Sequence, residues 1–561
     1  MKVIIVGGVA GGASCAARLR RLDEAAEILV VERGPFISYA NCGLPYYVGG
    51  VIPRESKLVL ADAALFRAQL NVEVRTLCEA VSISPEAKTV ELRDVTTGQL
   101  TVEAYDKLVL SPGASPIRPP LPGIDLPGIF VVRTVPDVHA IREWLEGHAP
   151  EPSGLDTYTG YQTVVPARRA VVVGGGFIGL EMAENLAHLG LDVTLVQRGP
   201  QLMSPMDPEM AHYVELHMTR NGVRLALGEN VTGFRQGAGS ALEVLTASGK
   251  AIPADIVVMG IGVQPEVGLA RTAGLAVGER GGIVVDDQMR TSVPDIFAVG
   301  DAVEVRDWVT SAQAHVALAG PANRQGRIAA EVIAGRDSRF RGTQGTAIVG
   351  LFGGAAAWTG VSEKTLRRIG DTDYEKVYIF PNSHAGYYPG AQYLAMKILF
   401  RRSDGRLLGA QAVGRDGVDK RIDAFAVALQ FGATVYDLEE AELTYAPQFG
   451  SAKSPVNFAG MVAADVLRGD MPVTHWEDEH PFLLDVRQPA ELAVEQVSGV
   501  VNIPLPELRA RLGELPSDRE IHVVCRSGQR AYYATRILLQ NGFAARTVSG
   551  GMMSRSTFWA G

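Results

Sequence analysis

Cysteine is scarce in this sequence: only four of the 561 residues are cysteines, namely Cys15, Cys42, Cys78 and Cys525. They lie far apart, and no two of them form a Cys-x-x-Cys pair. This scarcity argues against a disulfide framework and against a structural zinc site, both of which need several cysteines at short spacing. Any functional cysteine is therefore expected to act as a lone thiol, and no metal site is predicted.

Long apolar runs are also missing, as is an excess of positive charge. No stretch approaches the roughly 18 uninterrupted apolar residues that a membrane helix requires. The formal net charge is −9 and 20% of the residues are charged, which gives no general attraction to nucleic acid or to an anionic membrane. The apolar start at residues 3–6 runs directly into a glycine turn and lacks the features of an export signal. We therefore expect a cytoplasmic protein with small-molecule partners, and neither nucleic acid nor a membrane among them.

The length of 561 residues indicates several domains, because a single core rarely serves so long a chain. Strand-turn-helix units with continuous apolar runs recur at residues 3–22 and 170–189, a pattern typical of parallel α/β domains. Alternating strands and an apolar helix over residues 346–467 predict a separate α+β domain, and a small α/β unit follows it. The proline- and glycine-rich segment 147–166 is interpreted as a connector or insertion of unknown role.

A glycine-rich turn after the strand 171–173 has the spacing Gly-x-Gly-x-x-Gly, formed by Gly174, Gly176 and Gly179. A diphosphate needs such a turn between a strand and a helix, so that main-chain N–H groups and the helix N-terminus can approach its oxygens. The helix that follows contains Glu181. The motif predicts a dinucleotide site.

The N-terminal turn at residues 7–12 is less regular, because Val9 stands where the middle glycine of the motif usually lies. Glu32, at the end of the next strand, can accept hydrogen bonds from a ribose diol. A later strand and glycine turn end in a further acid, Asp301. Together these segments predict another dinucleotide site.

A lone cysteine, Cys42, follows the first strand-helix-strand unit, and no second cysteine lies four or five residues further on. An internal dithiol is therefore excluded. The flanking Asn41 and the Gly-x-Pro sequence are typical of a helix start or loop, where a thiolate can be stabilised. Cys15 is interpreted as a small packing residue among alanines, and Cys78 is given no role.

Another lone cysteine, Cys525, lies between the strand at 523–524 and the helix at 531–539. A loop at such a helix entrance offers several main-chain N–H groups, and Arg526 and Arg530 add positive charge. This environment favours an anionic thiolate or persulfide.

Residues 1 to about 460 resemble the disulfide reductase type of pyridine-nucleotide flavoproteins. The resemblance implies that FAD and a nicotinamide cofactor bind at the two glycine turns. The implied FAD residues are Gly7, Gly12, Glu32 and Asp301, and the implied nicotinamide-cofactor residues are Gly174, Gly176, Gly179 and Glu181. Where an acid would favour NADH, the sequence has Gln197 followed by Arg198, so the choice between NADH and NADPH stays open.

The segment 38–47 closely resembles the active site of coenzyme A disulfide reductases, in which one cysteine forms a mixed disulfide with coenzyme A. The resemblance implies that Cys42 is catalytic and that coenzyme A binds at Arg18, Arg21, Ser38 and Asn41. It also implies catalytic tyrosines in the α+β domain, namely Tyr445 and either Tyr387 or Tyr388. In that family this domain dimerises and completes the partner's site, so a homodimer follows. Lys420 and Arg421 are interpreted either as contacts for the coenzyme's phosphates or as surface charge.

The C-terminal unit resembles single-domain rhodaneses. The features that carry this resemblance are the Cys-x-x-Gly-x-Arg loop from Cys525 to Arg530 and the segments 484–487, 501–504 and 550–552. The Gly-His-Ile that usually precedes the Asn-Ile-Pro segment is missing here. The resemblance implies that Cys525 carries sulfane sulfur, with Arg526 and Arg530 as substrate-binding residues. A flexible tether after Leu467 would let Cys525 deliver that sulfur to Cys42.

The two resemblances together predict an α/β chain with two Rossmann-like domains, an α+β dimerisation domain and a rhodanese-like α/β domain. The predicted limits are 1–115 with 280–340 for FAD, 116–279 for NAD(P)H, 341–467 for dimerisation and 474–561 for the rhodanese-like domain. The predicted reaction reduces coenzyme A persulfide, polysulfide or coenzyme A disulfide with NAD(P)H, and the partners are small thiols, persulfides and disulfides.

Two alternatives stay open at this point. One is an NADH oxidase or peroxidase in which Cys42 becomes a sulfenic acid. The peroxidases that resemble this chain carry a histidine where it has Ala10, which favours thiol chemistry instead. The other alternative is a redox sensor without turnover.

Overall fold

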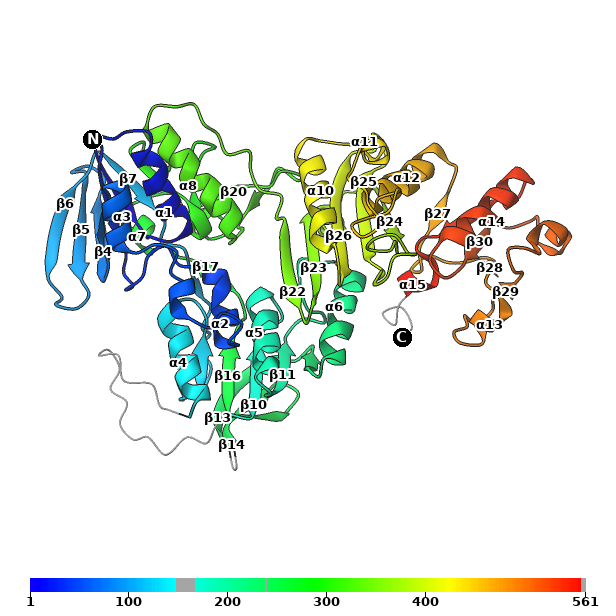
Figure 1. Ribbon diagram of the computed structural model, residues 1–561, viewed down its shortest axis with the longest axis horizontal. Coiled ribbons are helices and arrows are strands. Elements are labelled where there is room, and N and C mark those ends of the chain that lie inside the picture. Colours follow the sequence, from blue (N-terminus) through cyan, green and yellow to red (C-terminus); the bar gives the residue numbers. More distant parts are fainter. Residues whose placement is uncertain (148–166, 238–239, 556–561) are drawn as a thin grey trace. The chain divides into compact units, whose positions relative to one another are not determined.

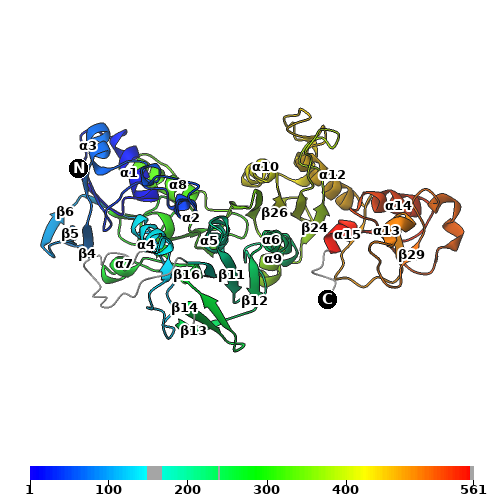
Figure 2. The ribbon, with the colours of Figure 1, turned by 60° about the horizontal axis from the view of Figure 1, so that its bottom comes forward.

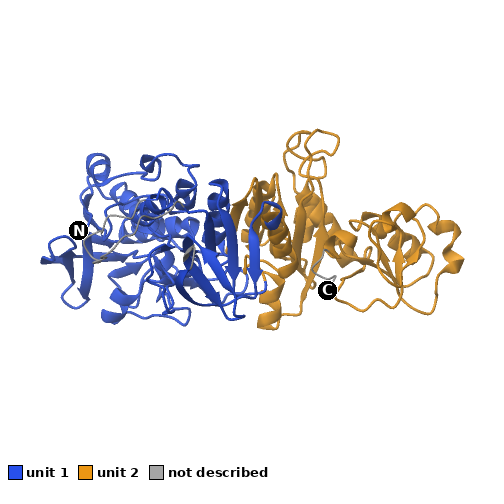
Figure 3. Ribbon diagram, turned by 90° about the horizontal axis from the view of Figure 1, so that it is seen from below, with its two compact units in different colours: residues 1–200, 219–343 blue, residues 201–218, 344–561 orange. Residues whose placement is uncertain are grey.

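The computed structural model describes residues 1–147, 167–237 and 240–555. All but the first residue of the predicted connector at 147–166 therefore lies outside the described residues. The chain forms two compact units, one of residues 1–200 and 219–343 and the other of residues 201–218 and 344–561 (Figure 3). Among the described residues, no helix combines the length and apolar character needed to cross a membrane.

The first unit contains a five-stranded parallel sheet in the order β19-β7-β1-β2-β3. Its strands are β1 (Lys2–Val6), β2 (Glu27–Val31), β3 (Glu73–Arg75), β7 (Lys107–Leu110) and β19 (Ile296–Ala298). The valine and isoleucine runs are buried, as expected for a sheet covered on both faces. Helices α1 (Ala10–Arg20) and α8 (Ala319–Ile333) pack side by side (Figures 1 and 2). A Cβ atom on Gly326 would lie 2.2 Å from the carbonyl oxygen of Gly11, so this helix packing requires glycine.

A second parallel sheet in the same unit has the order β12-β11-β10-β16-β9. Its strands are β9 (Ile129–Val131), β10 (Arg169–Val173), β11 (Asp192–Gln197), β12 (Arg224–Leu227) and β16 (Ile256–Met259). Helix α5 (Phe177–His188) follows β10, and α4 (Val135–Leu145) follows β9. Two antiparallel sheets accompany them: β4 (Cys78–Ser84), β5 (Thr89–Asp94) and β6 (Leu100–Ala104), and β13 (Val231–Gly237), β14 (Ser240–Thr246) and β15 (Ala251–Ala254). The two predicted nucleotide-binding folds are therefore present.

The second unit begins with an antiparallel sheet in the order β22-β23-β26-β25-β24. Its strands are β22 (Ala347–Leu351), β23 (Gly354–Gly360), β24 (Tyr374–Ile379), β25 (Ala395–Arg401) and β26 (Leu407–Gly414). Its helices are α9 (Glu363–Ile369), α10 (Val418–Gln430), α11 (Val435–Glu440) and α12 (Pro455–Arg468). Helix α10 lies against β23 and β26, so the predicted α+β layer is confirmed (Figure 1).

The C-terminal part of this unit is a parallel sheet in the order β27-β31-β30-β28-β29. Its strands are β27 (Val473–Thr474), β28 (Leu483–Asp485), β29 (Val501–Asn502), β30 (Ile521–Val524) and β31 (Ala545–Val548). Its helices are α13 (Pro489–Leu492), α14 (Gln529–Gln540) and α15 (Gly551–Arg555). The small α/β domain predicted at this end is confirmed.

The predicted flexible tether after Leu467 is wrong, because the C-terminal domain is docked on the antiparallel sheet. The main-chain N–H of Tyr378 donates to Ser549 Oγ at 3.1 Å. The His475 ring and the Glu375 carboxylate are 3.1 Å apart. Helix α6 (Pro208–Arg220) also takes part, since the Tyr213 hydroxyl donates to the Met553 carbonyl at 2.7 Å. A composition-based view of the linker could not reveal these contacts.

A buried ion cluster joins the segment 201–218 to the same sheet. The ammonium group of Lys397 is fully buried and lies 2.9 Å from Asp207, 2.5 Å from Glu209 and 2.6 Å from Glu363. Lys376 pairs with Glu363 and, beyond it, with Glu477 of the C-terminal domain. Burial alone would raise the pKa of Glu363, but the two ammonium groups outweigh it and hold that pKa well below its usual range.

Candidate functional site

The N-terminal glycine turn is tight at both of its predicted glycines. Gly7 has a φ of +95°, and a Cβ atom there would lie 2.0 Å from the Ser111 carbonyl oxygen. A Cβ atom on Gly12 would lie 1.8 Å from the Gly7 carbonyl oxygen. Val9, the departure from the motif, is the residue before α1 and has a φ of −101°, which any residue can adopt. The irregular motif therefore still forms a turn that suits a dinucleotide diphosphate.

Two acidic side chains flank this turn at the carboxyl edge of the sheet. The Glu32 carboxylate accepts main-chain N–H groups from Gly8 at 2.9 Å and from Gly34 at 2.8 Å. Asp301 follows β19, and burial raises the pKa of its carboxyl group although His315 and Arg133 act in the opposite direction. A fixed carboxylate beside a glycine turn and a second, half-buried acid fit the predicted FAD.

The second glycine turn has the same construction. Gly174 has a φ of +111°, and a Cβ atom there would lie 2.2 Å from the Gly260 carbonyl oxygen. A Cβ atom on Gly179 would lie 1.9 Å from the Gly174 carbonyl oxygen. Gly176, the residue before α5, faces open space, because a Cβ atom there would meet none of the described residues within 4 Å. The open face at the helix start fits the diphosphate of the predicted nicotinamide cofactor.

Glu181 lies on α5 and faces the cysteine loop. Its carboxylate accepts a hydrogen bond from the Tyr46 hydroxyl at 3.4 Å. Burial, with a smaller contribution from Glu184, raises the pKa of Glu181 to about 7. Sequence reasoning assigned Glu181 to the nicotinamide cofactor and missed Tyr46, which lies one helical turn after Cys42. The spacing of four residues could have indicated that Tyr46 lies on the same side of this segment as Cys42.

Cys42 is exposed and lies in the short 3-10 turn Asn41–Gly43, just before α2 (Leu44–Val48). The surrounding protein raises the pKa of the Cys42 thiol through desolvation, and the carboxylates of Glu181 and Asp301 raise it further. The expectation that this sequence stabilises the thiolate is therefore wrong for the polypeptide by itself. The local motif suggested a favourable helix start, but the charges that reach the thiol come from distant segments and are negative.

The four residues predicted to bind coenzyme A do not share one environment. Asn41 is exposed beside Cys42, and Ser38 adopts a positive φ of 45° while its N–H donates to the Gly8 carbonyl at 2.8 Å. Arg21 is exposed at the end of α1. Arg18 is instead held by Glu331 of α8, with a distance of 3.0 Å from Nε to the carboxylate. Arg18 is therefore already paired in this structure, and the shared role of Arg18 and Arg21 at a pyrophosphate stays a prediction.

The two predicted tyrosine loops meet in the second unit. The hydroxyl oxygens of Tyr387 and Tyr445 are 3.0 Å apart. Tyr388 instead packs its ring edge-on against His384, with 5.8 Å between the ring centres. The hydrogen bond with Tyr445 raises the pKa of Tyr387. Of the two residues left open by the sequence, the geometry pairs Tyr387 with Tyr445.

The neighbouring basic residues differ from each other. Lys420 is exposed, and its ammonium group donates to Thr444 Oγ1 at 3.3 Å. Arg421 is only 3% exposed, and its guanidinium donates to the Ser383 carbonyl at 2.5 Å. Both interpretations from the sequence, phosphate contact and surface charge, are therefore wrong for Arg421, because its side chain is buried and donates to main-chain carbonyl groups. The residues that cover it lie in other segments, so the pattern of its own helix could not reveal its burial.

The C-terminal cysteine loop lies where the sequence predicted it. Cys525 follows β30 and is buried, and Gly528, with a φ of +94°, precedes α14. The Cys525 carbonyl accepts the main-chain N–H of Met552 at 2.8 Å. A Cβ atom on Gly551 would lie 2.2 Å from that carbonyl oxygen, so the glycine allows the close approach of α15. The start of α15 therefore packs directly against the main chain of the cysteine loop.

The two arginines of this loop have different surroundings. Arg526 is exposed. Arg530 makes two parallel hydrogen bonds to Glu491, each 2.7 Å long. This pair lowers the pKa of Glu491 to about 2 and raises the pKa of Arg530. Glu491 was missed, although its place three residues after Gln488 in a capping box at the start of α13 was visible in the sequence.

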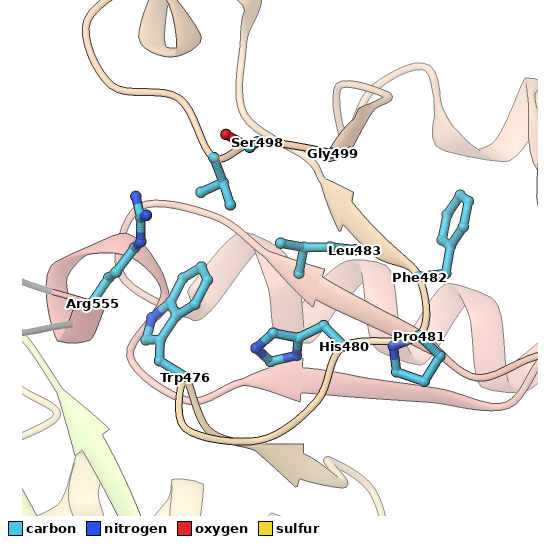
Figure 4. Close-up of a pocket in the computed structure, with 9 residues that line it drawn as sticks. Trp476, His480, Pro481, Phe482, Leu483, Ser498, Gly499 and Arg555 are labelled. Carbon is cyan, nitrogen blue, oxygen red and sulfur yellow. The ribbon is translucent and has the colours of Figure 1, made fainter. Parts of the chain in front are cut away.

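A cavity of about 490 Å³ also lies in the C-terminal domain, lined by Trp476, His480, Leu483, Arg555 and their neighbours (Figure 4). It borders the apolar cluster that contains Leu483 and Val524. Cys525 packs instead in the cluster that contains Ala531 and Leu538 of α14. Because neighbouring strand residues face opposite sides of a sheet, the cavity and the thiol belong to different faces.

Comparison with known protein families finds three matches along the chain. The family of pyridine nucleotide-disulphide oxidoreductases matches residues 1–326, and its dimerisation domain matches residues 347–454. The rhodanese-like domain matches residues 474–555. The predicted fold class is confirmed by these matches together with the sheets described above.

Individual relatives are similar over most of their length. Coenzyme A disulfide reductase from Staphylococcus epidermidis is 35% identical over 463 residues, which cover 82% of this chain and 99% of the relative. The crystal structure of reduced CoADR-RHD from Bacillus anthracis is 44% identical, with a TM-score of 0.94 and coverage of 100% of this chain and 98% of that chain. The structure of a NAD-dependent persulfide reductase from A. fulgidus is 36% identical, with a TM-score of 0.89 and coverage of 99% and 100%.

Proposed function

Because the chain belongs to the pyridine nucleotide-disulphide oxidoreductase family, we propose that it is an NAD(P)H-dependent, FAD-containing reductase of coenzyme A persulfide, polysulfide or coenzyme A disulfide. The observation that carries the proposal is the combination of one exposed lone thiol, Cys42, with a C-terminal rhodanese-like domain that holds a second lone thiol, Cys525. Relatives named for coenzyme A disulfide and persulfide reduction support this choice of substrate.

The proposed cofactor sites are the two glycine turns. FAD would be held by the turn at Gly7 and Gly12 together with Glu32 and Asp301. NAD(P)H would be held by a second group of residues, which comprises Gly174, Gly176, Gly179 and Glu181. When bound, FAD supplies a carrier that takes two electrons from NAD(P)H and passes them to sulfur at Cys42. We propose the same domain limits as the sequence predicts, with residues 1–115 and 280–340 binding FAD and residues 116–279 binding NAD(P)H. Residues 341–467 would form the dimerisation domain and residues 474–561 the rhodanese-like domain.

The proposed chemistry at Cys42 is thiol–disulfide exchange. The Cys42 thiolate attacks one sulfur of the persulfide, the sulfur–sulfur bond breaks, and one fragment leaves as hydrosulfide or coenzyme A thiolate. The other fragment stays on Cys42 in a new sulfur–sulfur bond, which two electrons cleave to regenerate the thiolate. In sum, NAD(P)H, one proton and coenzyme A persulfide give NAD(P)⁺, coenzyme A and hydrogen sulfide. Coenzyme A disulfide gives two molecules of coenzyme A instead.

A leaving thiolate needs a proton, and we assign its delivery to Tyr387 and Tyr445. Hydrogen bonding between them favours the protonated phenol of Tyr387, which is the form that can donate. The pair would serve the active site of the partner subunit in a homodimer. Exposed apolar side chains on α10 and a neighbouring loop support such an interface: Val427 is 56%, Phe431 77% and Phe449 65% exposed.

Coenzyme A would bind near Cys42, with Arg21, Ser38 and Asn41 as the proposed contacts. Arg18 would bind coenzyme A only after its ion pair with Glu331 is broken. Cys525 would carry or deliver sulfane sulfur, with Arg526 and Arg530 binding the sulfur donor. The proposal includes a cytoplasmic location, because the cytoplasm supplies NAD(P)H and keeps lone thiols such as Cys42 reduced.

One anaerobic assay tests the proposal. Oxidation of NADH and of NADPH is followed with coenzyme A persulfide, coenzyme A disulfide, polysulfide and elemental sulfur, and sulfide release is measured in parallel. The wild-type protein, Cys42→Ser, Cys525→Ser and the control Cys78→Ser are compared. We expect Cys42→Ser to abolish turnover of every sulfur substrate and Cys78→Ser to leave it intact.

The same assay in air separates the alternatives. Oxygen consumption that depends on Cys42 and exceeds sulfide release would favour an NADH oxidase. If no substrate supports steady NAD(P)H oxidation, a redox sensor becomes the better explanation. Unchanged rates in Cys525→Ser would remove the delivery role from the rhodanese-like domain and leave the role of Cys42 standing.

A further inference from the structure

Arg421, near the start of α10, is a buried cation held by main-chain oxygens. It is 3% exposed, although arginine is almost never buried unless it is paired. Within the described residues, each hydrogen bond that its guanidinium donates ends on a carbonyl group, at Ser383 (2.5 Å), Gly417 (3.2 Å) and Phe449 (3.5 Å). Desolvation lowers its pKa, although Asp416 and Asp419 act in the opposite direction. A charge buried at such a cost needs a reason.

Two of these carbonyl groups belong to the loops that carry the tyrosine pair. Ser383 lies just before Tyr387 in one loop, and Phe449 lies just after Tyr445 in the other. The loops are also tied directly, because the main-chain N–H of Ala385 donates to the Pro447 carbonyl at 3.2 Å. Arg421 therefore donates hydrogen bonds to the main chain of both loops.

The tyrosine side chains themselves have little to hold them. Tyr387 is 76% exposed and Tyr445 is 50% exposed, so packing does not fix their rings. Their hydroxyl contact of 3.0 Å therefore depends on where the two loop backbones are placed. A shift of about 1 Å between the loops would be enough to lose this contact and the alignment that proton transfer needs.

We propose that Arg421 is a positioning residue that clamps the loops of Tyr387 and Tyr445 together through the carbonyl groups of Ser383 and Phe449. The inference rests on the proposed function of the tyrosine pair and adds a residue that acts through it. Arginine suits this position because its planar guanidinium holds its donors in fixed directions: Nη2 donates to both loop carbonyl groups, and Nη1 donates to Gly417. The single ammonium of lysine cannot hold both carbonyl groups with the same geometry.

The test compares Arg421→Met, Arg421→Lys and the control Arg415→Met in the full-length, FAD-loaded protein. Arg415 is an exposed arginine just before α10, so the control makes the same exchange without touching the clamp. Each variant is also made in the Tyr387→Phe/Tyr445→Phe background. Three rates are measured: turnover of coenzyme A disulfide, anaerobic flavin reduction by NADH, and sulfur transfer from thiosulfate to cyanide.

We expect Arg421→Met to lower turnover roughly tenfold or more, while flavin reduction and sulfur transfer stay close to wild type. Arg421→Lys should recover only part of the loss, and Arg415→Met should show none. In the background without the two hydroxyls, Arg421→Met should cost nothing further, because residues that act through one another are not additive. An equal loss in both backgrounds, or a parallel fall of all three rates, would overturn the proposal.

A second measurement keeps the clamp testable if the proposed function fails. Amide hydrogen exchange at residues 383–390 and 444–449 should be faster in Arg421→Met than in wild type and unchanged in Arg415→Met. If wild type turns over neither coenzyme A disulfide nor persulfide, the proposed function falls, and the exchange data still decide whether Arg421 holds the loops. Unchanged exchange in Arg421→Met would reject the clamp.

Discussion

The side-chain oxygen of Gln197 accepts a hydrogen bond from the main-chain N–H of Gly175 at 3.0 Å. Glu32 makes the equivalent bond to Gly8 in the other nucleotide fold, at 2.9 Å. The two folds therefore place a side-chain acceptor at the same point, after the second strand and against the glycine turn. One acceptor is a carboxylate and the other a neutral amide, and this difference bears on which nicotinamide cofactor is preferred.

Gln197→Glu should shift the preference toward NADH. A carboxylate can still accept the Gly175 N–H, can bind both ribose hydroxyls, and repels a 2′-phosphate. We expect the ratio of kcat/KM for NADH to that for NADPH to rise about tenfold, the equivalent of one charged hydrogen bond. Steady-state kinetics with both cofactors measures this ratio. The control Gln99→Glu makes the same exchange at an exposed site, and an equal ratio in the two variants would refute the role of position 197.

Glu181→Gln should change how stability depends on pH. Burial raises the pKa of Glu181 to about 7, so the folded protein binds a proton there that the unfolded chain has released above its usual value of 4.5. Stability from this group is therefore lost as the pH rises from about 4.5 to 7, because the buried carboxylate must then ionise.

The variant, which cannot ionise, should gain stability relative to wild type at pH 8 and gain little at pH 5. Thermal unfolding between pH 5 and 8.5 measures this difference, with Glu143→Gln as an exposed control. A constant difference across the range would show that Glu181 does not titrate there.

Local patterns predicted much of the molecule. Gly7, Gly174 and the cysteine loops at Cys42 and Cys525 were found because each feature lies within one short stretch whose spacing reflects a strand-turn-helix geometry. The fold class followed from the repetition of such stretches. The acid at Glu32 was found in the same way, since it directly follows the strand that comes after the first turn.

Contacts between distant segments were not predictable in this way. The pairing of Arg18 with Glu331 links helices separated by most of the first unit. The burial of Arg421 depends on two loops that only the folded chain brings together. Docking of the C-terminal domain likewise depends on side chains such as Ser549, whose partner lies on a different sheet. Periodicity and spacing in the sequence describe one helix or strand at a time, whereas each of these contacts is made between two elements that are distant in the sequence.

Tyr387→Phe and Tyr445→Phe should each slow reduction of coenzyme A disulfide, whereas Tyr388→Phe should not. The first two lose one hydroxyl of the 3.0 Å pair, and Tyr388 makes a ring contact instead. A general acid typically contributes about a hundredfold or more. Stopped-flow reoxidation of the reduced enzyme by substrate separates this step from flavin reduction. A large loss in Tyr388→Phe would show that the wrong neighbour has been assigned.

Arg530→Lys should impair sulfur transfer by the C-terminal domain although it keeps the charge. Arg530 makes two parallel bonds of 2.7 Å to Glu491, and an ammonium group cannot reproduce that fork. We expect a loss of roughly tenfold in the thiosulfate:cyanide assay, with Arg509→Lys, at an exposed arginine of the same domain, as the unaffected control. Full activity in Arg530→Lys would show that charge alone is sufficient.

Lys397→Met should destabilise the second unit, and the loss should be larger at pH 8 than at pH 5. The Lys397 ammonium lies within 2.9 Å of Asp207, Glu209 and Glu363, so its removal leaves three buried carboxylates without that cation. Breaking a buried pair in this way typically costs about 3–5 kcal/mol.

The pH dependence follows from what the lysine now does to its partners. Lys397 holds the pKa of Glu363 below its usual value against the effect of burial. Without the Lys397 ammonium, burial acts on the pKa of Asp207 with no ion-pair partner against it and on the pKa of Glu363 with only Lys376 against it. These two carboxylates therefore take up protons more readily at pH 5 than at pH 8, and the penalty shrinks at the lower pH. Denaturant unfolding at both pH values, with the exposed Lys453→Met as control, measures the difference. A loss equal at both pH values would mean that packing of the lysine side chain, and not its charge, stabilises this cluster.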